Sequence, residues 1–260
     1  MPLRGPRGNQ VRVFVSGVSS GIGMELARQL IGAGHEVWGI ARREAKLQAL
    51  ASELDSPSFY YSSCDTADEA ACAQVYGQMQ ERGFLPDIVV LNAAIDLEEE
   101  KPALDFAQTA RMMRTNVDGA FYWVTAFIKP FLQRGHGQFI GVSSLFAHWP
   151  DGASVGYSAS KSALSMLLRG LRIRYAGTGL HFKLLYLGPV DTPINPRFEQ
   201  EEPSSSFLVA SAPDTARYIT GMMTSSRQNF YFPLYIFLIF TFLRWLPDRV
   251  FESLTSPFKR

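Results

Sequence analysis

Residues 11–34 read VRVFVSGVSSGIGMELARQLIGAG, and this stretch decides which fold the chain can adopt. It opens with a short apolar run rich in valine, which is typical of a buried strand. A glycine-rich turn follows, and residues 24–34 then carry apolar side chains at helical spacing until a glycine ends the pattern. A strand, a glycine-rich turn and a helix in this order favour an α/β fold built on a parallel sheet.

The glycine-rich turn predicts an anion-binding site. Gly17, Gly21 and Gly23 have the spacing G-x-x-x-G-x-G. Glycine allows sharp turns and a close approach of backbone N–H groups to an anion, and the positive end of the next helix points to the same place. A pyrophosphate suits this arrangement, so we take the turn as the first part of a dinucleotide site: Gly17, Ser19, Ser20, Gly21, Ile22 and Gly23. A tight turn that binds no ligand is the alternative.

The rest of the chain continues the alternation of strands and helices. Apolar runs predict strands at residues 35–40, 59–64, 87–92, 137–144 and 181–188, and helical patterns predict helices near 106–128 and at 157–177. Near-continuous apolar strands indicate a parallel sheet that helices cover on both faces. Because we find no internal repeat and no linker, the 260 residues predict a single domain.

Composition narrows the classes of function. The formal net charge is +1, which provides no general attraction to nucleic acid. Residues 1–10 are basic and rich in glycine and proline without an apolar run behind them, so we interpret them as a flexible tail rather than a secretory signal. Cys64 and Cys72 form neither a metal-ligand pattern nor a disulfide framework. Two free thiols and no metal site favour a cytoplasmic protein.

The second strand indicates which dinucleotide is bound. NAD sites usually place Asp or Glu about 20 residues after the glycines, where the acid holds the ribose 2′-OH. Here the strand ends in Ile40, Ala41, Arg42 and Arg43, with no acid at its tip. A guanidinium can donate two hydrogen bonds to a phosphate, so we predict NADP(H), with Arg42 as the preferred partner of the 2′-phosphate. A solvated arginine pair, with Glu44 nearby, is the alternative.

The ends of the predicted strands point to one common site. Ligands of open α/β sheets bind beyond the carboxyl ends of the strands. Six separate segments deliver a small or polar residue to that edge: Gly17, Arg42, Asp65, Asn92, Ser144 and Gly188. Each alone has an ordinary explanation, such as a helix cap for Asp65 or a turn for Asn92. Their coincidence favours a binding site.

Residues 157–161 read YSASK and predict proton-transfer chemistry. Positions i and i+4 share one helix face, so Tyr157 and Lys161 project to the same side. A free tyrosine has a pKa of about 10, and a nearby ammonium stabilises the phenolate and lowers that pKa. Such a pair donates or accepts a proton near neutral pH, and the Ser144 hydroxyl is a candidate to hold a carbonyl oxygen that gathers negative charge. Tyrosine and lysine four residues apart are also common on ordinary helix surfaces.

Taken together, these motifs resemble those of the short-chain dehydrogenase/reductase family. The matching segments follow the family order over roughly residues 10–195: SGVSSGIG, CD at 64–65, NAA at 92–94, RTNVDG around 116, GVSS ending at 144, YSASK, and LGPVDT at 187–192. The resemblance implies a three-layer, doubly wound Rossmann-type parallel sheet of about seven strands, with residues 230–232 in the last one. It also implies an oxidoreductase that acts on a small molecule and forms homodimers or homotetramers.

The resemblance further implies roles for single residues. The catalytic set would be Asn116, Ser144, Tyr157 and Lys161. Tyr157 would be the general acid/base and Ser144 would orient the carbonyl. Lys161 would bind the nicotinamide ribose and lower the pKa of Tyr157, and Asn116 would hold a water in a proton relay. Further cofactor contacts would come from Asp65 at the adenine, Asn92 and Ala93 near the adenosine ribose, and Gly188, Val190 and Thr192 near the nicotinamide.

Two departures from the family pattern concern the cofactor surface. The usual NNAG reads Leu91-Asn92-Ala93-Ala94, so Ala94 adds a methyl group where the backbone passes the cofactor. The usual proline before Gly188 is a leucine, and a proline follows instead. Neither change removes a catalytic group.

The C-terminal region is unusually apolar, since residues 230–243 read FYFPLYIFLIFTFL. Ten to fourteen helical residues span about 15–21 Å, which is short of the roughly 30 Å hydrocarbon core, so we do not expect a spanning helix. Three alternatives remain. The run packs against another subunit, lines a pocket for an apolar substrate, or makes a peripheral membrane contact through residues 234–246, with Arg244 and Trp245 at the boundary.

These observations define the expected organisation and function. We expect a catalytic domain at 11–233, a substrate flap at 192–206 and an apolar extension at 234–260. The expected activity is NADP(H)-dependent interconversion of a carbonyl and a secondary alcohol, on a lipophilic ketone or 3-oxo lipid. A non-catalytic dinucleotide-binding sensor or scaffold is the alternative. The short chain after the predicted sixth strand leaves little room for the substrate domain of a sugar-nucleotide epimerase or dehydratase.

Overall fold

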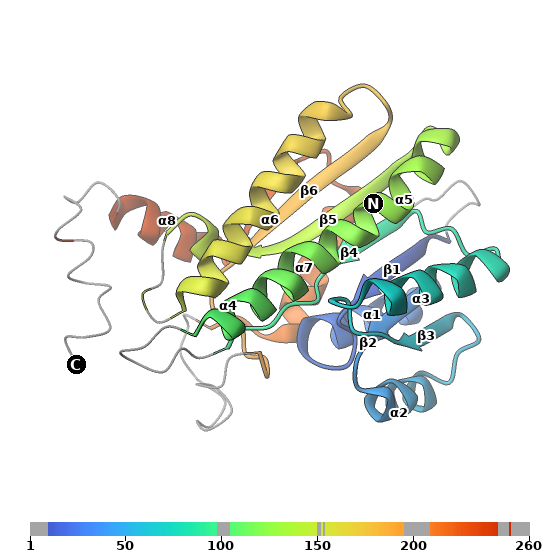
Figure 1. Ribbon diagram of the computed structural model, residues 1–260. Coiled ribbons are helices and arrows are strands. Elements are labelled where there is room, and N and C mark those ends of the chain that lie inside the picture. Colours follow the sequence, from blue (N-terminus) through green and yellow to red (C-terminus); the bar gives the residue numbers. More distant parts are fainter. Residues whose placement is uncertain are drawn as a thin grey trace.

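Seven parallel strands form one sheet in the computed structural model of the chain (Figure 1). The structure describes residues 10–97, 105–149, 152, 154–194, 209–243 and 250. The strands are β1 (Arg12–Ser16), β2 (Glu36–Ala41), β3 (Phe59–Ser63), β4 (Ile88–Leu91), β5 (Gly137–Ser144), β6 (Leu180–Leu187) and β7 (Asn229–Phe232). Their order, β3-β2-β1-β4-β5-β6-β7, confirms the predicted doubly wound sheet, including its last strand.

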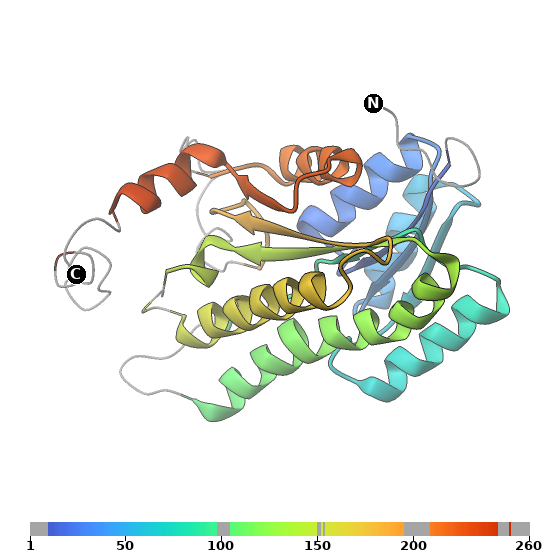
Figure 2. The same ribbon diagram turned by 90° about the horizontal axis from the view of Figure 1, so that it is seen from above.

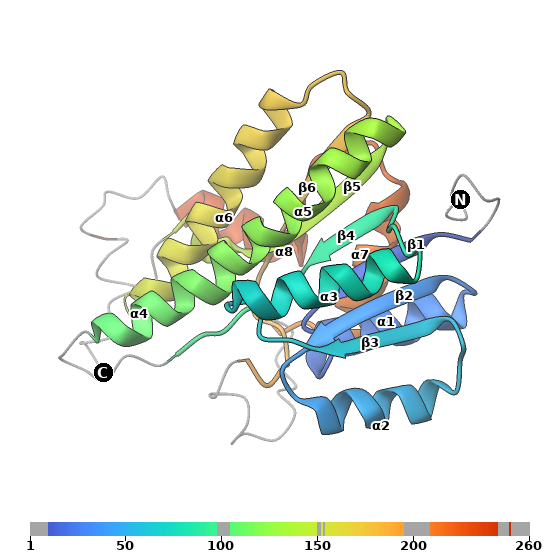
Figure 3. The ribbon, with the colours of Figure 1, turned by 45° about the vertical axis from the view of Figure 1, so that its right-hand side comes forward.

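Helices cover both faces of this sheet. They are α1 (Gly21–Gly32), α2 (Glu44–Leu54), α3 (Glu69–Glu81), α4 (Phe106–Met113), α5 (Gly119–Arg134), α6 (Val155–Arg174), α7 (Ala212–Thr224) and α8 (Leu234–Leu243). Buried side chains of α1, α2 and α7 share one apolar cluster with the sheet, and those of α3, α5 and α6 share a second. Figure 2 shows the two layers on opposite sides of the sheet, and Figure 3 shows α3, α5 and α6 side by side.

The order of the strands also places the site. The chain winds outward from β1 to β3 and then returns to the other side of β1 with β4. The loops that follow β1 and β4 therefore leave the sheet in opposite directions and open a crevice at its carboxyl edge, which is where ligands of such sheets bind.

One long helical segment differs from the prediction. The helix expected at 106–128 begins at Phe106, but it passes through one wide π-helical turn at Arg114–Asp118 and continues beyond Pro130 to Arg134. The buried side chains of Phe127 and Phe131 hold the turns on either side of the proline against the core. The wide turn brings Asn116 inward, and such turns are frequent at functional sites.

The apolar C-terminal run forms the helix α8. Its inner face buries Ile236, and the rings of Phe237 and Phe240 contact Trp149. Its outer face exposes large apolar side chains: Leu234, Tyr235, Leu238, Ile239 and Phe242. None of the described helices combines the length and the apolar content that crossing a bilayer requires.

Some predicted segments lie outside the described residues. These are the tail at 1–9, most of the predicted flap (195–206), and Arg244 and Trp245 at the end of the apolar run. The proposed division of the chain into domain, flap and extension stays a prediction.

Candidate active site

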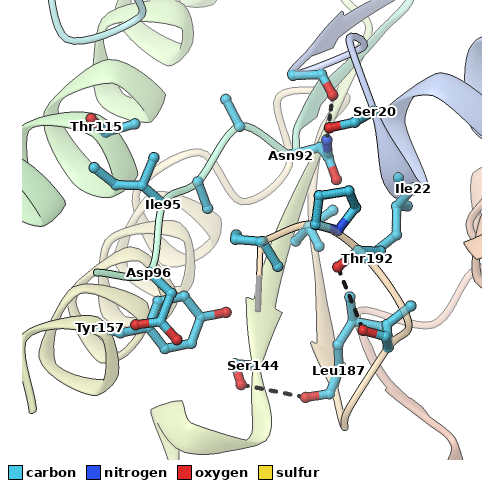
Figure 4. A pocket seen from close by; sticks show the side chains of 18 of the residues that line it. Ser20, Ile22, Asn92, Ile95, Asp96, Thr115, Ser144, Tyr157, Leu187 and Thr192 are labelled. Atoms are coloured by element: carbon cyan, nitrogen blue, oxygen red, sulfur yellow. Dashed lines mark hydrogen bonds between the residues drawn. The ribbon is translucent and has the colours of Figure 1, made fainter. Parts of the chain in front are cut away.

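A cavity of about 560 Å³ lies at the carboxyl edge of the sheet. All six of the strand-end residues singled out in the sequence line it: Gly17, Arg42, Asp65, Asn92, Ser144 and Gly188. The other lining residues among those expected in the site are Ser19, Ser20, Gly21, Ile22, Ala93, Tyr157, Lys161, Val190 and Thr192. Figure 4 shows Ser144 and Tyr157 approaching this space from one side and Asn92, Ile22 and Thr192 from the other. Gly23 and Asn116 are not among the lining residues.

The glycine-rich turn is shaped by close backbone contacts. Gly17 has a φ of +80°, and a Cβ atom there would lie 2.9 Å from the Cα atom of Ala93. A Cβ atom on Gly23 would lie 2.2 Å from the carbonyl oxygen of Gly17, so Gly23 lets helix α1 pack directly beneath the turn. The turn therefore leaves backbone exposed to the cavity at the start of α1, which is the arrangement that a pyrophosphate requires.

Hydrogen bonds from β4 hold the turn in place. The hydroxyl oxygen of Ser16 accepts hydrogen bonds from the backbone N–H groups of Asn92 and Ala93, both at 3.0 Å. The side-chain amide of Asn92 donates in return to the carbonyl oxygens of Ser16 and Gly17, at 3.0 and 3.2 Å. Asn92 thus lines the cavity but uses its amide group to fix the turn. Ser16 therefore positions the turn. No sequence motif identifies it, because a serine inside an apolar strand is common.

The two arginines after β2 have different surroundings. The guanidinium of Arg43 donates to the hydroxyl of Ser19 at 2.8 Å and to that of Ser20 at 2.7 Å, so it already spans the glycine-rich turn. Arg42, the arginine preferred from the sequence, is half-exposed and stays 4.0 Å from the carboxylate of Asp65. Asp65 also accepts a hydrogen bond from the backbone N–H of Ala67, which fixes the bend after β3. Both guanidiniums line the cavity, and Arg43 has the closer contact with the turn.

Tyr157 and Lys161 lie on α6, as the spacing of YSASK predicts. The ammonium nitrogen of Lys161 is buried, donates to the carbonyl oxygen of Val142 at 2.9 Å, and lies 5.5 Å from the centre of the Tyr157 ring. Burial lowers the pKa of Lys161 to about 8, while the negative charge of Asp96 opposes that change. Lys161 therefore still carries its charge at neutral pH.

The electrostatics of Tyr157 differ from the prediction. Burial, followed by the negative charge of Asp96, raises the pKa of Tyr157, and a hydrogen bond with Ser144 lowers it only in part. The sequence argument expects Lys161 to lower this pKa, but the ammonium of Lys161 donates to Val142, and the charge that acts on the Tyr157 pKa is the negative charge of Asp96. The phenol is consequently kept protonated at neutral pH, which suits a proton donor better than a base.

Ser144 ends β5 and is buried against the cavity. Its hydroxyl donates to the carbonyl oxygen of Leu187 at 3.4 Å and accepts from the backbone N–H of Phe146 at 3.2 Å. The long bond to Leu187 is weak, so the hydroxyl can turn toward another acceptor at little cost. Ser144 and Tyr157 thus present two hydroxyl groups to the same space (Figure 4).

Asn116 lies behind this pair in the π-helical turn. Its carboxamide accepts from the backbone N–H of Ile95 at 2.8 Å and donates to the carbonyl oxygen of Ile95 and to the hydroxyl of Ser160, both at 2.9 Å. The hydroxyl of Ser160 in turn donates to the carbonyl oxygen of Tyr157. Asn116 therefore links the loop after β4 to the helix that carries Tyr157, and the proton-relay role expected for it stays a prediction. Ser160 is a further residue that the motif analysis passes over.

The segment that follows β6 forms one wall of the cavity. The backbone N–H of Gly188 donates to the carbonyl oxygen of Phe232, and Val190 pairs with Ala210 through a short parallel bridge. The hydroxyl of Thr192 donates to the carbonyl oxygen of Val190 at 3.5 Å. These bonds hold Gly188, Val190 and Thr192 along one wall even though a leucine replaces the usual proline before Gly188.

One further charged residue lines the cavity beside Tyr157. Asp96 follows β4, and its carboxylate accepts a hydrogen bond from the hydroxyl of Ser154, directly before α6. Sequence reasoning does not find Asp96, because a lone acid in a polar loop after a strand has no motif. It becomes visible only when the loop after β4 folds against the start of α6.

The residues fit a nicotinamide dinucleotide. The backbone cradle at Gly17 and Gly23 suits a pyrophosphate, and the guanidiniums of Arg42 and Arg43 suit a further phosphate. At the opposite end of the cavity, Ser144 and Tyr157 offer hydroxyl groups to an oxygen atom. The arrangement can bind a dinucleotide and hold a carbonyl or an alcohol beside it.

Sequence comparisons agree with this geometry. The family profile described as short chain dehydrogenase matches residues 11–203. A protein of Myxococcus xanthus described as an uncharacterized oxidoreductase is 32% identical over 178 residues, which cover 67% of this chain and 70% of that protein. The NADP-dependent 3-hydroxy acid dehydrogenase YdfG of Escherichia coli K12 is 29% identical over 171 residues, covering 65% of this chain and 68% of that enzyme.

Solved structures show the same fold. A serine dehydrogenase in a closed form with NADP⁺ superposes with a TM-score of 0.77 at 24% identity, covering 85% of this chain and 93% of that one. A short-chain dehydrogenase from Streptomyces avermitilis superposes with a TM-score of 0.79 at 22% identity, covering 95% and 96% of the two chains.

Proposed function

Because the chain belongs to the short-chain dehydrogenase family, we propose that it is an NADP(H)-dependent oxidoreductase that interconverts a lipophilic ketone, such as a 3-oxo lipid, and its secondary alcohol. Members of this family are oxidoreductases that bind a nicotinamide cofactor. The observation that carries the proposal is the meeting of Ser144, Tyr157 and Lys161 at one cavity that the glycine-rich turn also borders.

The chemistry follows from the side chains. When bound, the nicotinamide supplies or accepts the hydride. Ser144 and Tyr157 donate hydrogen bonds to the substrate oxygen, which gathers negative charge during reduction. Tyr157 holds a proton at its phenol oxygen because its raised pKa keeps it protonated, and it passes this proton to the substrate oxygen. We assign the buried ammonium of Lys161 to the ribose of the bound nicotinamide rather than to the phenol, because burial and the charge of Asp96 set the pKa of Tyr157.

The preference for NADP(H) has two supports. No acid stands at the tip of β2 to hold a ribose 2′-OH, and two arginines follow the strand instead. Arg43, bonded to Ser19 and Ser20, is our first candidate for the 2′-phosphate, and Arg42 is the second. A relative and a similar structure whose descriptions name NADP support the preference for NADP(H) over NAD(H).

The apolar character of the substrate is inferred from α8. Phe240 lines the cavity together with Ile95, Leu145, Phe146 and Ile194. An apolar chain attached to the carbonyl would bury its surface against these side chains and gain about 25 cal/mol for each Å² removed from water. The interpretation of the C-terminal run as a pocket wall is therefore the one that the contacts of Phe240 support.

The outer face of α8 exposes large apolar side chains that a partner would bury. Short-chain dehydrogenases are often oligomeric, and exposed apolar patches commonly mark interfaces, so we propose that a second copy of the chain covers this face in a homodimer or homotetramer. Light scattering of the purified protein and of its Phe242→Glu variant tests this. An unchanged mass would show that the oligomer uses another surface, and flotation of the protein with lipid vesicles would favour the membrane contact instead.

The activity is tested by a chain-length series. NADPH oxidation is measured with methyl ketones of increasing length, with Tyr157→Phe as the inactive control. We expect kcat/KM to rise with chain length, and we expect deletion of residues 234–260 to reduce this gain for long ketones only. An equal loss for short and long ketones would reject the role of α8. NADPH binding without turnover of any ketone would favour the dinucleotide sensor.

A further inference from the structure

The carboxylate of Asp96 lies in the part of the cavity that Tyr157 also lines. The charged side chains in the described lining are Arg42, Arg43, Asp65, Asp96 and Lys161. Arg42, Arg43 and Asp65 follow β2 and β3, on the nucleotide side. Asp96 instead lies beside Tyr157 (Figure 4), in a cavity that apolar side chains such as Leu145 and Phe240 also line.

The position of Asp96 is held from two directions. The residue before it, Ile95, has both its backbone N–H and its carbonyl oxygen bonded to the side chain of Asn116, at 2.8 and 2.9 Å. The carboxylate itself accepts a hydrogen bond from Ser154, the last residue before α6. Asp96 is therefore fixed by the same framework that positions Tyr157, and preorganised groups of this kind bind with little loss of entropy.

The charge of Asp96 changes the pKa values of both Tyr157 and Lys161. It raises the pKa of Tyr157, and it also opposes the lowering of the Lys161 pKa by burial. Its carboxylate is thus close to the phenol that holds the substrate oxygen. A carboxylate can accept several hydrogen bonds, so Asp96 can accept from a ligand as well as from Ser154, and a ligand that brings a positive N–H group to this position gains a charge-assisted hydrogen bond.

We propose that Asp96 forms a subsite for a protonated amine that the substrate carries next to its carbonyl group. The inference rests on the proposed function. The amine N–H donates to the Asp96 carboxylate while Ser144 and Tyr157 hold the carbonyl oxygen, and the apolar remainder of the substrate lies against Phe240. The same carboxylate repels an acid at this position, so the substrate differs from the 3-hydroxy acids in the description of the Escherichia coli relative.

The wild-type protein tests the proposal with four medium-chain ketones and NADPH. One is an uncharged methyl ketone, and one carries a dimethylammonium group on the carbon next to the carbonyl. A third carries that group at the far end of the chain, and the fourth is the matching 3-oxo acid. We expect kcat/KM for the adjacent cation to exceed that for the uncharged ketone by about 10–100-fold, the range of one hydrogen bond to a charged group, and the acid to react slowest.

Two variants separate the charge from its structural support. Asp96→Asn keeps an oxygen that can accept from Ser154 but removes the charge, so it should abolish the preference for the adjacent cation and relieve the discrimination against the acid. Asp55→Asn removes a carboxylate from an exposed position at the end of α2 and should leave the ratios unchanged. Loss of the preference in both variants would overturn the assignment to Asp96.

The outcomes distinguish this inference from the proposed function. Turnover of all four ketones without regard to charge would overturn the amine subsite while leaving the reductase intact. A preference for the cation at the far end equal to that for the adjacent cation would also overturn it. If no ketone is reduced although NADPH binds, the proposed function itself fails.

Discussion

The two sides of the cavity are built differently. On the side of β1, β2 and β4, polar groups are bonded to one another before any ligand arrives, as Asn92 is to Ser16 and Gly17, and Arg43 is to Ser19. On the side of α6 and α8, apolar and aromatic side chains such as Leu145 and Phe240 line the cavity together with the hydroxyls of Ser144 and Tyr157 and the charged groups of Asp96 and Lys161. The side of the glycine-rich turn presents a preformed backbone cradle, whereas the side of α6 and α8 combines an apolar surface with hydroxyl groups and two opposite charges.

The contrast indicates that separate parts of one sheet can serve cofactor binding and substrate binding. A dinucleotide needs fixed N–H groups and cations, which turns and strand ends supply locally. A variable substrate needs a surface that helices from distant parts of the chain assemble. Changes on the two sides should therefore have separable effects on cofactor binding and on substrate turnover.

The largest effect is expected where the two sides meet. Tyr157→Phe removes the proton donor without changing the nucleotide side, so we expect kcat/KM to fall by about 10²–10⁴-fold, the usual range for a general acid. Titration of NADPH by fluorescence should give a Kd close to that of the wild type. Retained turnover would show that another group donates the proton.

Replacing each of the two arginines tests which of them binds the 2′-phosphate of NADPH. Arg43→Ala should lower kcat/KM for NADPH by about 10–100-fold, because it removes charged hydrogen bonds. Its effect on NADH should be much smaller, since NADH has no 2′-phosphate. Arg42→Ala is the matched comparison, with a smaller expected loss because Arg42 does not contact the turn. A larger loss from Arg42→Ala would assign the phosphate to that residue, as the sequence alone suggests.

A pair of glycines tests the cradle itself. Gly17 and Gly177 both have a φ of +80°, but a Cβ atom at Gly17 would lie 2.9 Å from Ala93, whereas one at Gly177 would have no heavy atom within 4 Å outside its own neighbours. Each change to alanine should cost about 1–2 kcal/mol of stability through backbone strain, and Gly17→Ala should cost more because its Cβ also clashes with the backbone of Ala93. Thermal unfolding measures this cost, and only Gly17→Ala should also weaken NADPH binding. Equal binding in both variants would contradict the close-contact argument.

Two phenylalanines on α8 test the substrate side in the same manner. Phe240→Ala removes an aromatic wall of the cavity and should raise KM for long-chain ketones by about 3–10-fold, consistent with losing part of a buried side chain. Phe242→Ala changes the outer face of the same helix, where 76% of the side chain is exposed, and should leave KM unchanged. Similar effects of the two changes would mean that α8 acts through its overall packing rather than through the cavity.

The smallest effect concerns pH. Asp96 raises the pKa of Tyr157 and opposes the lowering of the Lys161 pKa, so both pKa values fall when its charge is removed. In the direction of alcohol oxidation, which needs the phenolate, the rising limb of the kcat/KM profile should therefore move to lower pH in Asp96→Asn. The profile of Asp55→Asn should match the wild type. A shift to higher pH would contradict the proximity of Asp96 to the phenol.

Much of the candidate site could be predicted from the sequence because its signals are local. The glycines of the first turn, the missing acid after the second strand and the spacing of Tyr157 and Lys161 each act within a few residues. The strand order and the convergence of the six strand ends then follow from the rules of parallel sheets. The choice between Arg42 and Arg43 already needs the folded turn, because side-chain direction at the end of a strand depends on the local twist.

The doubly wound sheet, the glycine-rich turn and the placement of Tyr157 and Lys161 on one helix thus follow from local patterns of residues, since periodicity and glycine conformations act over short distances. The folded chain, in contrast, is needed to place Asp96 beside Tyr157, to bond Asn116 to Ile95 and Ser160, and to bring Phe240 to the cavity. These contacts join segments far apart in the chain. Their pKa effects depend on burial and on charges that approach only after folding, so no local pattern of residues encodes them.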